Sequence, residues 1–369
     1  MNEQLLERFL KNYMPEGEQY KKKDEYLAAV SEMFTDEELE MYITAAGFKV
    51  PFSVEQLSDK CQVENFEQVL KSCIDKFLIR IHEDEESLKY IANTMFEVHG
   101  LYLRDSVTNK RFAGMSINHA ISDYALEALN VGKGGTKIPT PNHMKRYKFM
   151  IDPSQAKRIE LGTEIPDKRR VSTTNDVIEL IKRQTVFAFA PCSCRVTSET
   201  TEGYHCKTTA QCIFFNEIAL YFISIGQGKQ ISKQEATDYI IDSGKKGLVH
   251  ITDNVKDKAY VLCNCCRCCC LVMKSVQRGE IHAVMASKYK PVHNISECVS
   301  CGECERICPV HAIELRDGDI HFDMEKCMGC GNCANLCLKD AIVLELRENY
   351  GDLESKFNNY VELHSVLRL

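Results

Sequence analysis

The sequence predicts an α+β protein of several domains, and three observations support this. The chain has 369 residues, which is more than one small hydrophobic core requires. Apolar residues follow helical spacing in some stretches and gather in β-branched and aromatic runs in others. The chain contains 20 cysteines, and all but two follow residue 190. We predict a helical domain over 1–100, a connecting region over 101–168, a cysteine-rich α/β domain over 169–288, a C-terminal domain with eight cysteines over 289–345, and a tail over 346–369.

The first hundred residues are predicted to form helices that end in a β-hairpin. A polar lead-in helix is followed over Asp24–Glu40 by one helix or a broken pair. Ser53 and Gln56 have the spacing of a capping box, which predicts a helix start. A further helix begins near residue 64, and FLIRIHEDEESLKYIA predicts two short strands joined by an acidic turn. Three helices followed by a hairpin resemble a winged helix.

The charges of this region argue against nucleic-acid binding. The helix expected to read DNA carries Glu64, Glu67 and Asp75 against two lysines, and the hairpin turn is HEDEE. These carboxylates would repel a phosphate backbone. A structural or partner-docking role is therefore favoured, and no nucleic-acid partner is expected. Cys61 and Cys73 are expected to be buried core thiols.

The connecting region carries no recognised phosphate-binding motif. Its loop NVGKGGTKIPTPNH lacks the spacing of a P-loop. The basic residues from Lys145 to Arg170 are expected to form a solvated face, which could dock an acidic partner.

Helix-like and strand-like stretches alternate in the cysteine-rich domain. TNDVIELIKRQ predicts a helix, and TVFAFAPCSCRV predicts a strand that runs into two cysteines. CIFFNEIALYFISIG is predicted to be a helix that ends at Gly226. The helix capped by Ser232 is predicted to end at Gly244 or Gly247, before a short strand at LVHIT. The cysteines are expected on loops that converge.

The last eight cysteines repeat one spacing. CVSCGECERICP and CMGCGNCANLCL both follow C-x2-C-x2-C-x3-C. Three thiolates at these intervals reach three irons of one cubane, and the fourth cysteine ligates the other cluster. Gly302 and Gly331 allow the tight turns needed beside a cluster. The predicted ligand sets are Cys298, Cys301, Cys304 and Cys337 for cluster 1, and Cys327, Cys330, Cys333 and Cys308 for cluster 2.

This repeat closely resembles the two-cluster ferredoxin domain of bacteria, over about residues 290–345. The resemblance implies two [4Fe–4S] clusters. The second copy departs from the family pattern at Leu338, where proline is usual. Because that proline is not a ligand, we expect only a small change in loop rigidity. Two tetrahedral zinc sites fit this doubled spacing much less well than two cubanes.

Ten further cysteines lie upstream of the repeat, six of them in the stretch CNCCRCCC. The candidates for an additional metal site are Cys192, Cys194, Cys206, Cys212, Cys263, Cys265, Cys266, Cys268, Cys269 and Cys270. Ten close thiolates would repel one another without a metal, and Arg195 and Arg267 among them favour the thiolate form. Another iron–sulfur cluster is the favoured occupant, with zinc as the alternative. The surplus over four thiols leaves two interpretations open: some are spare, or the set binds two clusters or one of unusual nuclearity.

The sequence predicts a cytoplasmic protein without membrane insertion. Its first residues are polar and lack the apolar core of a signal peptide. Apolar runs such as Ile218–Ile225 are too short to span a bilayer. Thiols stay reduced in the cytosol, where clustered cysteines mostly bind metal, so no disulfides are expected. The net charge of −7 combines acidic ends with a basic middle, which favours protein partners over nucleic acid.

As a whole, the chain resembles anaerobe proteins described as 4Fe–4S dicluster-domain, ferredoxin-type electron-transfer proteins. The resemblance is carried by the winged-helix-like start, PCSCR, GLVH, CNCCRCCC and the terminal repeat. It implies cluster binding and redox chemistry. Two cubanes and a further centre on one chain favour low-potential electron transfer to or from a partner oxidoreductase. Two alternatives stay open: a reductase with a substrate-binding cluster in the middle domain, and a redox-sensing transcription regulator. No nucleotide, flavin or molybdopterin fingerprint supports a stand-alone enzyme, so an electron carrier or redox subunit is expected.

Overall fold

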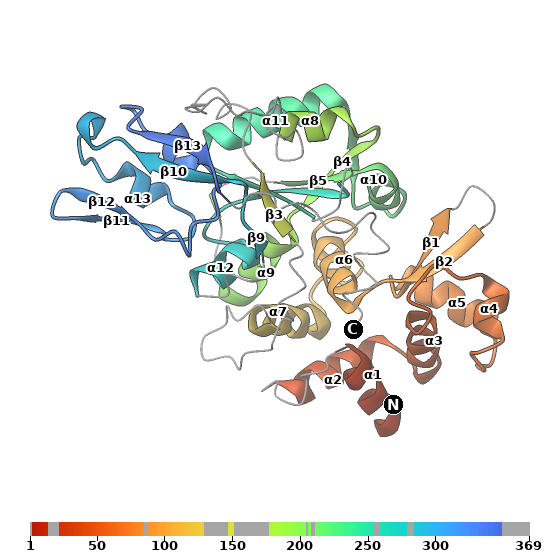
Figure 1. The fold of residues 1–369 in the computed structure, drawn as a ribbon. Helices are drawn as coiled ribbons and strands as arrows, with labels where there is room; N and C mark the ends of the chain where they lie inside the picture. The colour runs from red at the N-terminus through yellow and green to blue at the C-terminus, as the bar shows by residue number, and fades with distance from the viewer. Residues whose placement is uncertain are drawn as a thin grey trace. The chain divides into compact units, whose positions relative to one another are not determined.

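In a computed structural model, the chain forms two compact units; Figure 1 draws the fold as a ribbon. Unit 1 consists of Met1–Pro139, Val196–Tyr204 and Val361–Leu369, and unit 2 of Thr140–Arg195 and His205–Tyr360. The structure describes residues 2–13, 22–83, 88–128, 147–150, 177–203, 206–207, 211–253, 259–278 and 284–348. The predicted loop at 130–143, most of the basic stretch, the acidic hairpin turn and nearly all of the predicted tail lie outside these ranges.

Unit 1 is built from helices and one β-hairpin. Thr35, Ser53 and Thr94 each form a capping box with the residue three positions on, which begins α3, α4 and α6. The predicted cap at Ser53 is therefore confirmed, and the predicted broken helix pair is α2 and α3. The elements are α1 (Glu3–Tyr13), α2 (Lys23–Met33), α3 (Asp36–Ala46), α4 (Val54–Ser58), α5 (Phe66–Asp75), β1 (Ile79–Glu83), β2 (Leu88–Ala92), α6 (Met95–Val107) and α7 (Ser116–Ala128).

The order of helices and hairpin in unit 1 matches the predicted order. β1 and β2 pair antiparallel, and a bridge between Phe52 and Tyr90 extends the pairing. Cys61 and Cys73 are buried, as expected for core thiols. The predicted boundary at residue 100 falls inside α6, and α7 packs against both α2 and α6. The compact unit therefore continues past the predicted boundary, while its assignment as a winged helix stays a prediction.

His99 of α6 links the stability of unit 1 to pH. Its buried ring lies 2.9 Å from the Tyr26 hydroxyl (Nε2 to Oη). Burial lowers the pKa of His99 from 6.5 to about 3. The unfolded chain therefore binds a proton at this ring below about pH 6.5, whereas the folded chain binds it only near pH 3.

We expect the contribution of His99 to be complete above pH 6.5 and to decrease as the pH falls toward 3. Within that window the loss is on the order of 1.4 kcal/mol per pH unit. His99→Gln removes the titration while keeping a group that can bond Tyr26. Hydrogen exchange of the α2 and α6 amides, compared between wild type and variant at pH 7 and at pH 5, measures the effect. An equal change in both proteins between the two pH values would contradict it.

The centre of unit 2 is a seven-stranded sheet with the order β6-β4-β5-β8-β7-β3-β9. Neighbouring strands are antiparallel except β3 and β9. The predicted α/β class of this region is corrected to α+β, because connections as short as that between β7 and β8 join antiparallel neighbours. The elements are β3 (Tyr147–Met150), α8 (Val177–Lys182), β4 (Phe187–Pro191), β5 (Gln211–Phe215), α10 (Asn216–Ser224), β6 (Lys229–Ile231), α11 (Lys233–Lys245), β7 (Val249–Asp253), β8 (Val261–Cys265), α12 (Leu271–Gln277) and β9 (Val284–Met285). The helix α9 (Ser193–Glu202) begins in unit 2, and its residues from Val196 on are assigned to unit 1.

Helices cover both faces of this sheet (Figure 1). On one face, α8 and α11 pack against Ile213 and Leu262 of the central strands. On the other face, Met273 of α12 packs against Ile251 of β7. A capping box at Ser232 begins α11, as predicted. Of the two glycines predicted to end this helix, Gly247, with a φ of +74°, lies just after its end.

One predicted helix is in part a strand. The first residues of CIFFNEIALYFISIG form β5, and only the following residues form α10. Asn216, at a φ of 51°, makes the turn between them. The stretch reads as one helix because a buried strand followed by a buried helix gives a continuous apolar run. The correction matters for the metal site, because it places Cys212 on a strand rather than on a loop.

The C-terminal module, residues 289–346, consists of two antiparallel strand pairs and two short helices. β10 pairs with β13, and β11 pairs with β12. Gly302 and Gly331 have φ values of 74° and 83° and directly precede α13 and α14, so both predicted turns use left-handed glycines. The elements are β10 (Tyr289–His293), the 3-10 helix η5 (Ile295–Glu297), α13 (Glu303–Ile307), β11 (Ile313–Arg316), β12 (Asp319–Phe322), α14 (Asn332–Asn335) and β13 (Ile342–Leu346).

Candidate metal centres

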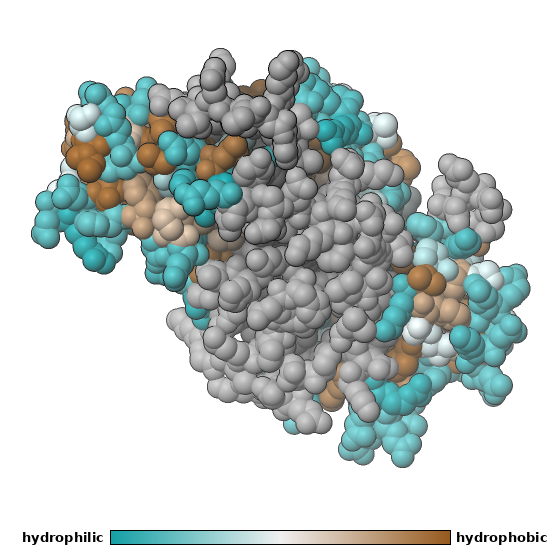
Figure 2. Space-filling model, viewed as in Figure 1, coloured by the Kyte–Doolittle hydropathy of each residue, from teal (hydrophilic) through white to brown (hydrophobic). Residues whose placement is uncertain are grey.

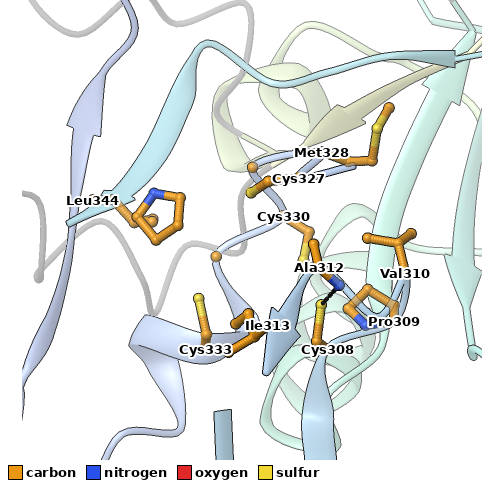
Figure 3. Close-up of a pocket in the computed structure, with 13 residues that line it drawn as sticks. Cys308, Pro309, Val310, Ala312, Ile313, Cys327, Met328, Cys330, Cys333 and Leu344 are labelled. Carbon is orange, nitrogen blue, oxygen red and sulfur yellow. Dashed lines mark hydrogen bonds between the residues drawn. The ribbon is translucent and has the colours of Figure 1, made fainter. Parts of the chain in front are cut away.

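One pocket of the C-terminal module is lined by cysteines from both copies of the repeat (Figure 3). Cys327, Cys330 and Cys333 of the second copy line it together with Cys308 of the first. The rest of the lining is mostly apolar. This crossing of one cysteine between copies is what the predicted ligand set of cluster 2 requires. Four thiols in an apolar pocket are a donor set that fits a [4Fe–4S] cluster.

Backbone N–H groups donate hydrogen bonds to the sulfurs of the module. The Ala312 N–H donates to Cys308 Sγ at 3.2 Å, as Figure 3 shows, and the Ser300 N–H donates to Cys298 Sγ at 3.4 Å. Such bonds favour the thiolate and tune the potential of a bound cluster. Burial has the opposite effect and raises the pKa of both Cys308 and Cys333. These thiols therefore ionise most readily beside a cation.

The predicted cysteines of cluster 1 lie nearer to solvent. Cys301 is exposed, whereas Cys298, Cys304 and Cys337 are half-buried. Burial raises the pKa of Cys304, and the charges of Cys301 and Cys298 raise it further. Cys304 belongs to α13, which packs against α14, and Cys337 follows α14. Cys298, Cys301 and Cys304 are thus close together in the sequence, and the fourth predicted ligand, Cys337, comes from the segment that follows the adjacent helix α14.

Six of the ten upstream cysteines form a hydrogen-bonded ring, here called the six-thiol ring. Its members are contributed by the end of β4, the start of α9, β5, β8 and the residue before α12. The Sγ atoms of Cys265 and Cys270 lie 3.2 Å apart. In order around the ring, the members are Cys192, Cys194, Cys270, Cys265, Cys263 and Cys212.

Strand alternation brings the ring together. Cys263 and Cys265 lie two residues apart on β8 and therefore point to the same face of the sheet. Asn264 between them points to the other face, where its Oδ1 lies 2.7 Å from His250 Nδ1. The register between β5 and β8 places Cys212 beside Cys263. The ring is therefore built on rigid strands rather than on loops alone.

Hydrogen bonds shift the pKa values of the ring cysteines in opposite directions. Bonds from Cys194 and Cys212 lower the pKa of Cys192 well below its usual value. Bonds from Cys194 and Cys265 lower the pKa of Cys270 to about 6. The same kind of bond raises the pKa of Cys194 and Cys212. Because buried like charges at this distance repel, all six can ionise together only beside a cation. The donor set fits a thiolate-ligated metal cluster.

The other four upstream cysteines form a more compact set, the four-thiol group. All four Sγ atoms lie within 4.8 Å of one another, and in the part of the chain that the structure describes this is the one group of metal-ligating side chains with that property. A hydrogen bond from Cys269 lowers the pKa of Cys266 to about 4. The members are Cys206, Cys266, Cys268 and Cys269.

The two arginines among the thiols have different roles. Arg195 Nη2 donates to Cys266 Sγ at 3.6 Å. Burial lowers the pKa of Arg195, but the charges of Cys192 and Cys266 outweigh burial and raise it, so the guanidinium stays charged beside both thiol sets. Arg267 is exposed, and its Nη1 donates to the carbonyl oxygen of Arg306 at 2.5 Å. The expectation that an arginine favours the thiolate form thus applies to Arg195. Arg267 instead links the stretch CNCCRCCC to the C-terminal module by its hydrogen bond to Arg306.

The six-thiol ring and the C-terminal module share one hydrophobic core. Cys265 and Cys270 belong to the same buried cluster as two of the pocket cysteines. Gln277, at the end of α12, donates from Nε2 to the Pro309 carbonyl oxygen at 2.6 Å. The ring and the pocket are therefore parts of one packed structure within unit 2.

Comparison with known proteins identifies the C-terminal repeat. A family described as 4Fe-4S dicluster domain matches residues 297–341, which include all eight cysteines of the repeat. No curated protein and no solved structure matches the chain. No helix within the described ranges is both long and apolar enough to cross a membrane. The match and the clustered thiols together support an iron–sulfur protein with a role in electron transfer.

Proposed function

We propose that the protein is a low-potential electron-transfer protein with three iron–sulfur centres, which passes electrons to or from a partner oxidoreductase in a reducing cytoplasm. The observation that carries this proposal is the six-thiol ring, packed into the same core as a cysteine pocket of a dicluster domain. When bound, such clusters supply one-electron transfer. All 20 cysteines are free thiols, which suits metal binding in a reducing compartment.

The chain would hold its centres with three separate sets of thiols. Cluster 1 takes Cys298, Cys301, Cys304 and Cys337, cluster 2 takes Cys308, Cys327, Cys330 and Cys333, and the third centre takes its ligands from the six-thiol ring.

The surface around the cluster 1 cysteines suits a docking partner. Ile295, Val299 and Leu338 flank these cysteines in the sequence and are 71%, 59% and 88% exposed. Figure 2 shows hydrophobic residues among hydrophilic ones on the surface of the C-terminal module, at the left of the view. Exposed apolar side chains that gather in one patch mark protein-binding surfaces. Cluster 1, which includes the exposed Cys301, is therefore the proposed contact with a redox partner, and the ring, with three buried and three half-buried cysteines, is the proposed inner centre.

A reductase with substrate bound at the ring is less well supported. That function needs an iron with an open position. The ring offers six thiols, more than the four that a cubane requires, so its donors suffice to occupy every iron of such a cluster. Cys265 and Cys270 of the ring are also buried in one core with α12 and the C-terminal module. Electron transfer, which needs no open position, is the better fit.

Electron paramagnetic resonance during an anaerobic redox titration tests the proposal. We expect three reducible centres in the wild type. Cys265→Ser should lose the signal of the third centre and at least about four irons, while the signals of the C-terminal module persist. Cys61→Ser, at a buried thiol of unit 1, is the control and should keep all three. Two centres in the wild type, or unchanged iron in Cys265→Ser, would contradict the proposal.

A further inference from the structure

We propose that the four-thiol group is a separate site for a single zinc ion. This inference goes beyond the proposed function, which assigns only the other six upstream thiols. It divides the stretch CNCCRCCC between two metals. Cys263, Cys265 and Cys270 serve the iron–sulfur centre, and the remaining three cysteines join Cys206 around zinc.

The distances between the sulfurs fit one tetrahedral ion. A Zn–S bond of about 2.3 Å places the four sulfurs of a tetrahedron about 3.8 Å apart. Cys206 Sγ lies 3.7 Å from Cys266 Sγ and 3.6 Å from Cys268 Sγ, and the Sγ atoms of Cys268 and Cys269 are 3.9 Å apart. The group therefore has the size of a tetrathiolate site around one ion.

The cluster ligand sets of the same chain provide an internal comparison. A cubane carries each thiolate on a different iron, so its thiolate sulfurs lie farther apart than those around a single ion. Among the described residues, no three sulfurs of the six-thiol ring, or of either set in the C-terminal module, lie within 4.8 Å of one another. In the six-thiol ring close approaches are confined to pairs, such as Cys265 and Cys270 at 3.2 Å, whereas all four sulfurs of the four-thiol group lie together, and this difference indicates a different occupant.

Charge and coordination favour zinc. Four thiolates around Zn²⁺ leave two negative charges, and the Arg195 guanidinium at Cys266 offsets one of them. Soft thiolate donors in a tetrahedron select zinc or iron. Thiols fill all four positions, as in structural zinc sites, and no position remains for a substrate. Zinc binding is not a redox step: Zn–S bonds replace S–H bonds, and the displaced protons pass to the solvent.

The position of the group gives the ion a structural role. Cys266 directly follows β8, and Cys269 directly precedes Cys270, the residue before α12. Zinc would tie this turn to Cys206, about 60 residues earlier in the chain, and would close a long loop. The ring members Cys265 and Cys270 lie at the two ends of the same turn. The zinc site therefore holds the cysteine-rich stretch in the conformation that the ring requires.

Two variants within the same stretch test the site. Zinc and iron per chain are measured for the wild type, Cys268→Ser and Cys265→Ser, and zinc X-ray absorption reports the ligands. We expect about one zinc with four sulfurs at about 2.3 Å in the wild type. Cys268→Ser should lose at least about nine-tenths of the zinc and keep the irons of the C-terminal module. Cys265→Ser should lose iron and keep zinc.

Each outcome decides between the two proposals. A wild type without zinc, in which Cys268→Ser lowers iron, would show that iron occupies the four-thiol group and would overturn the zinc site. Full zinc in Cys268→Ser would overturn it as well, because the ion would then be bound elsewhere. Unchanged iron in Cys265→Ser would instead contradict the third iron–sulfur centre and leave the zinc result standing. Cys206→Ser, from a different segment, repeats the zinc test if Cys268→Ser does not fold.

Discussion

Gly329→Ala is expected to remove about half of the iron of the C-terminal module. Gly329 lies between Cys327 and Cys330 and has a φ of 65°. A Cβ at this position would overlap the Tyr289 carbonyl oxygen and the Ser287 hydroxyl oxygen. Tyr289 is held in β10, so the turn itself must move, together with the cysteines on either side. Overpacking costs about 1–3 kcal/mol, and the left-handed backbone adds about 1–2 kcal/mol for a residue with a Cβ.

Gly318→Ala is the matched control for this prediction. Gly318 belongs to the same module and also has a positive φ, of 90°, but a Cβ there would meet nothing within 4 Å. Gly318→Ala therefore carries only the free-energy cost of a left-handed backbone for a residue with a Cβ, and this variant should keep its iron. Iron per chain and thermal stability are measured for both variants after anaerobic purification. Full iron in Gly329→Ala, or equal losses in the two variants, would show that the packing at Gly329 does not shape the pocket.

Cys308→Ser is expected to destroy the cluster held by the second copy of the repeat, although Cys308 belongs to the first. The reason is its place in the pocket with Cys330. About four irons should be lost. Paramagnetic resonance of the reduced protein should show the same residual signal for Cys308→Ser and Cys330→Ser. Cys301→Ser should show the complementary signal, because it belongs to the other set.

This comparison of three variants tests the crossing directly. If Cys308→Ser left the same residual signal as Cys301→Ser, each copy of the repeat would hold its own cluster. The ligand sets proposed here would then be wrong, even though the total number of clusters would be unchanged. Cys73→Ala, at a buried thiol of unit 1, should leave both signals intact and controls for handling of the protein.

The sequence was sufficient to predict the C-terminal module because its chemistry depends on local spacing. Gly302 and Gly331 turn the backbone as the motif implies. The capping boxes at Ser53 and Ser232 are local signals of the same kind, and both predicted helices begin there. The prediction that Cys308 ligates the cluster of the second copy rests on known cluster chemistry, because the spacing within a single copy does not indicate it.

The division of the upstream cysteines was not predicted, because it depends on contacts between distant segments. The alternation of Cys263 and Cys265 on one strand is visible in the sequence and could have placed them in one set. Their partner Cys212 was expected on a loop, however, and its strand becomes clear only from pairing with β4 and β8. Cys206 contacts Cys266 across about 60 residues, and no local pattern indicates such a contact.

The role of Arg267 shows the same limit of sequence reasoning. An arginine within six cysteines suggests an electrostatic partner for thiolates. The side chain instead extends to the Arg306 carbonyl oxygen on α13. The direction in which an exposed arginine points depends on which element packs beside it, and in this protein that element lies about 40 residues later in the chain.

The number of irons and acid-labile sulfides per anaerobically purified chain tests the central claim most directly. We expect about twelve or more of each: about eight from the C-terminal module and at least about four from the six-thiol ring. About eight of each would show that the ring holds no iron–sulfur centre. A colourless protein without sulfide, carrying zinc in place of iron, would contradict the assignment as an iron–sulfur electron-transfer protein altogether.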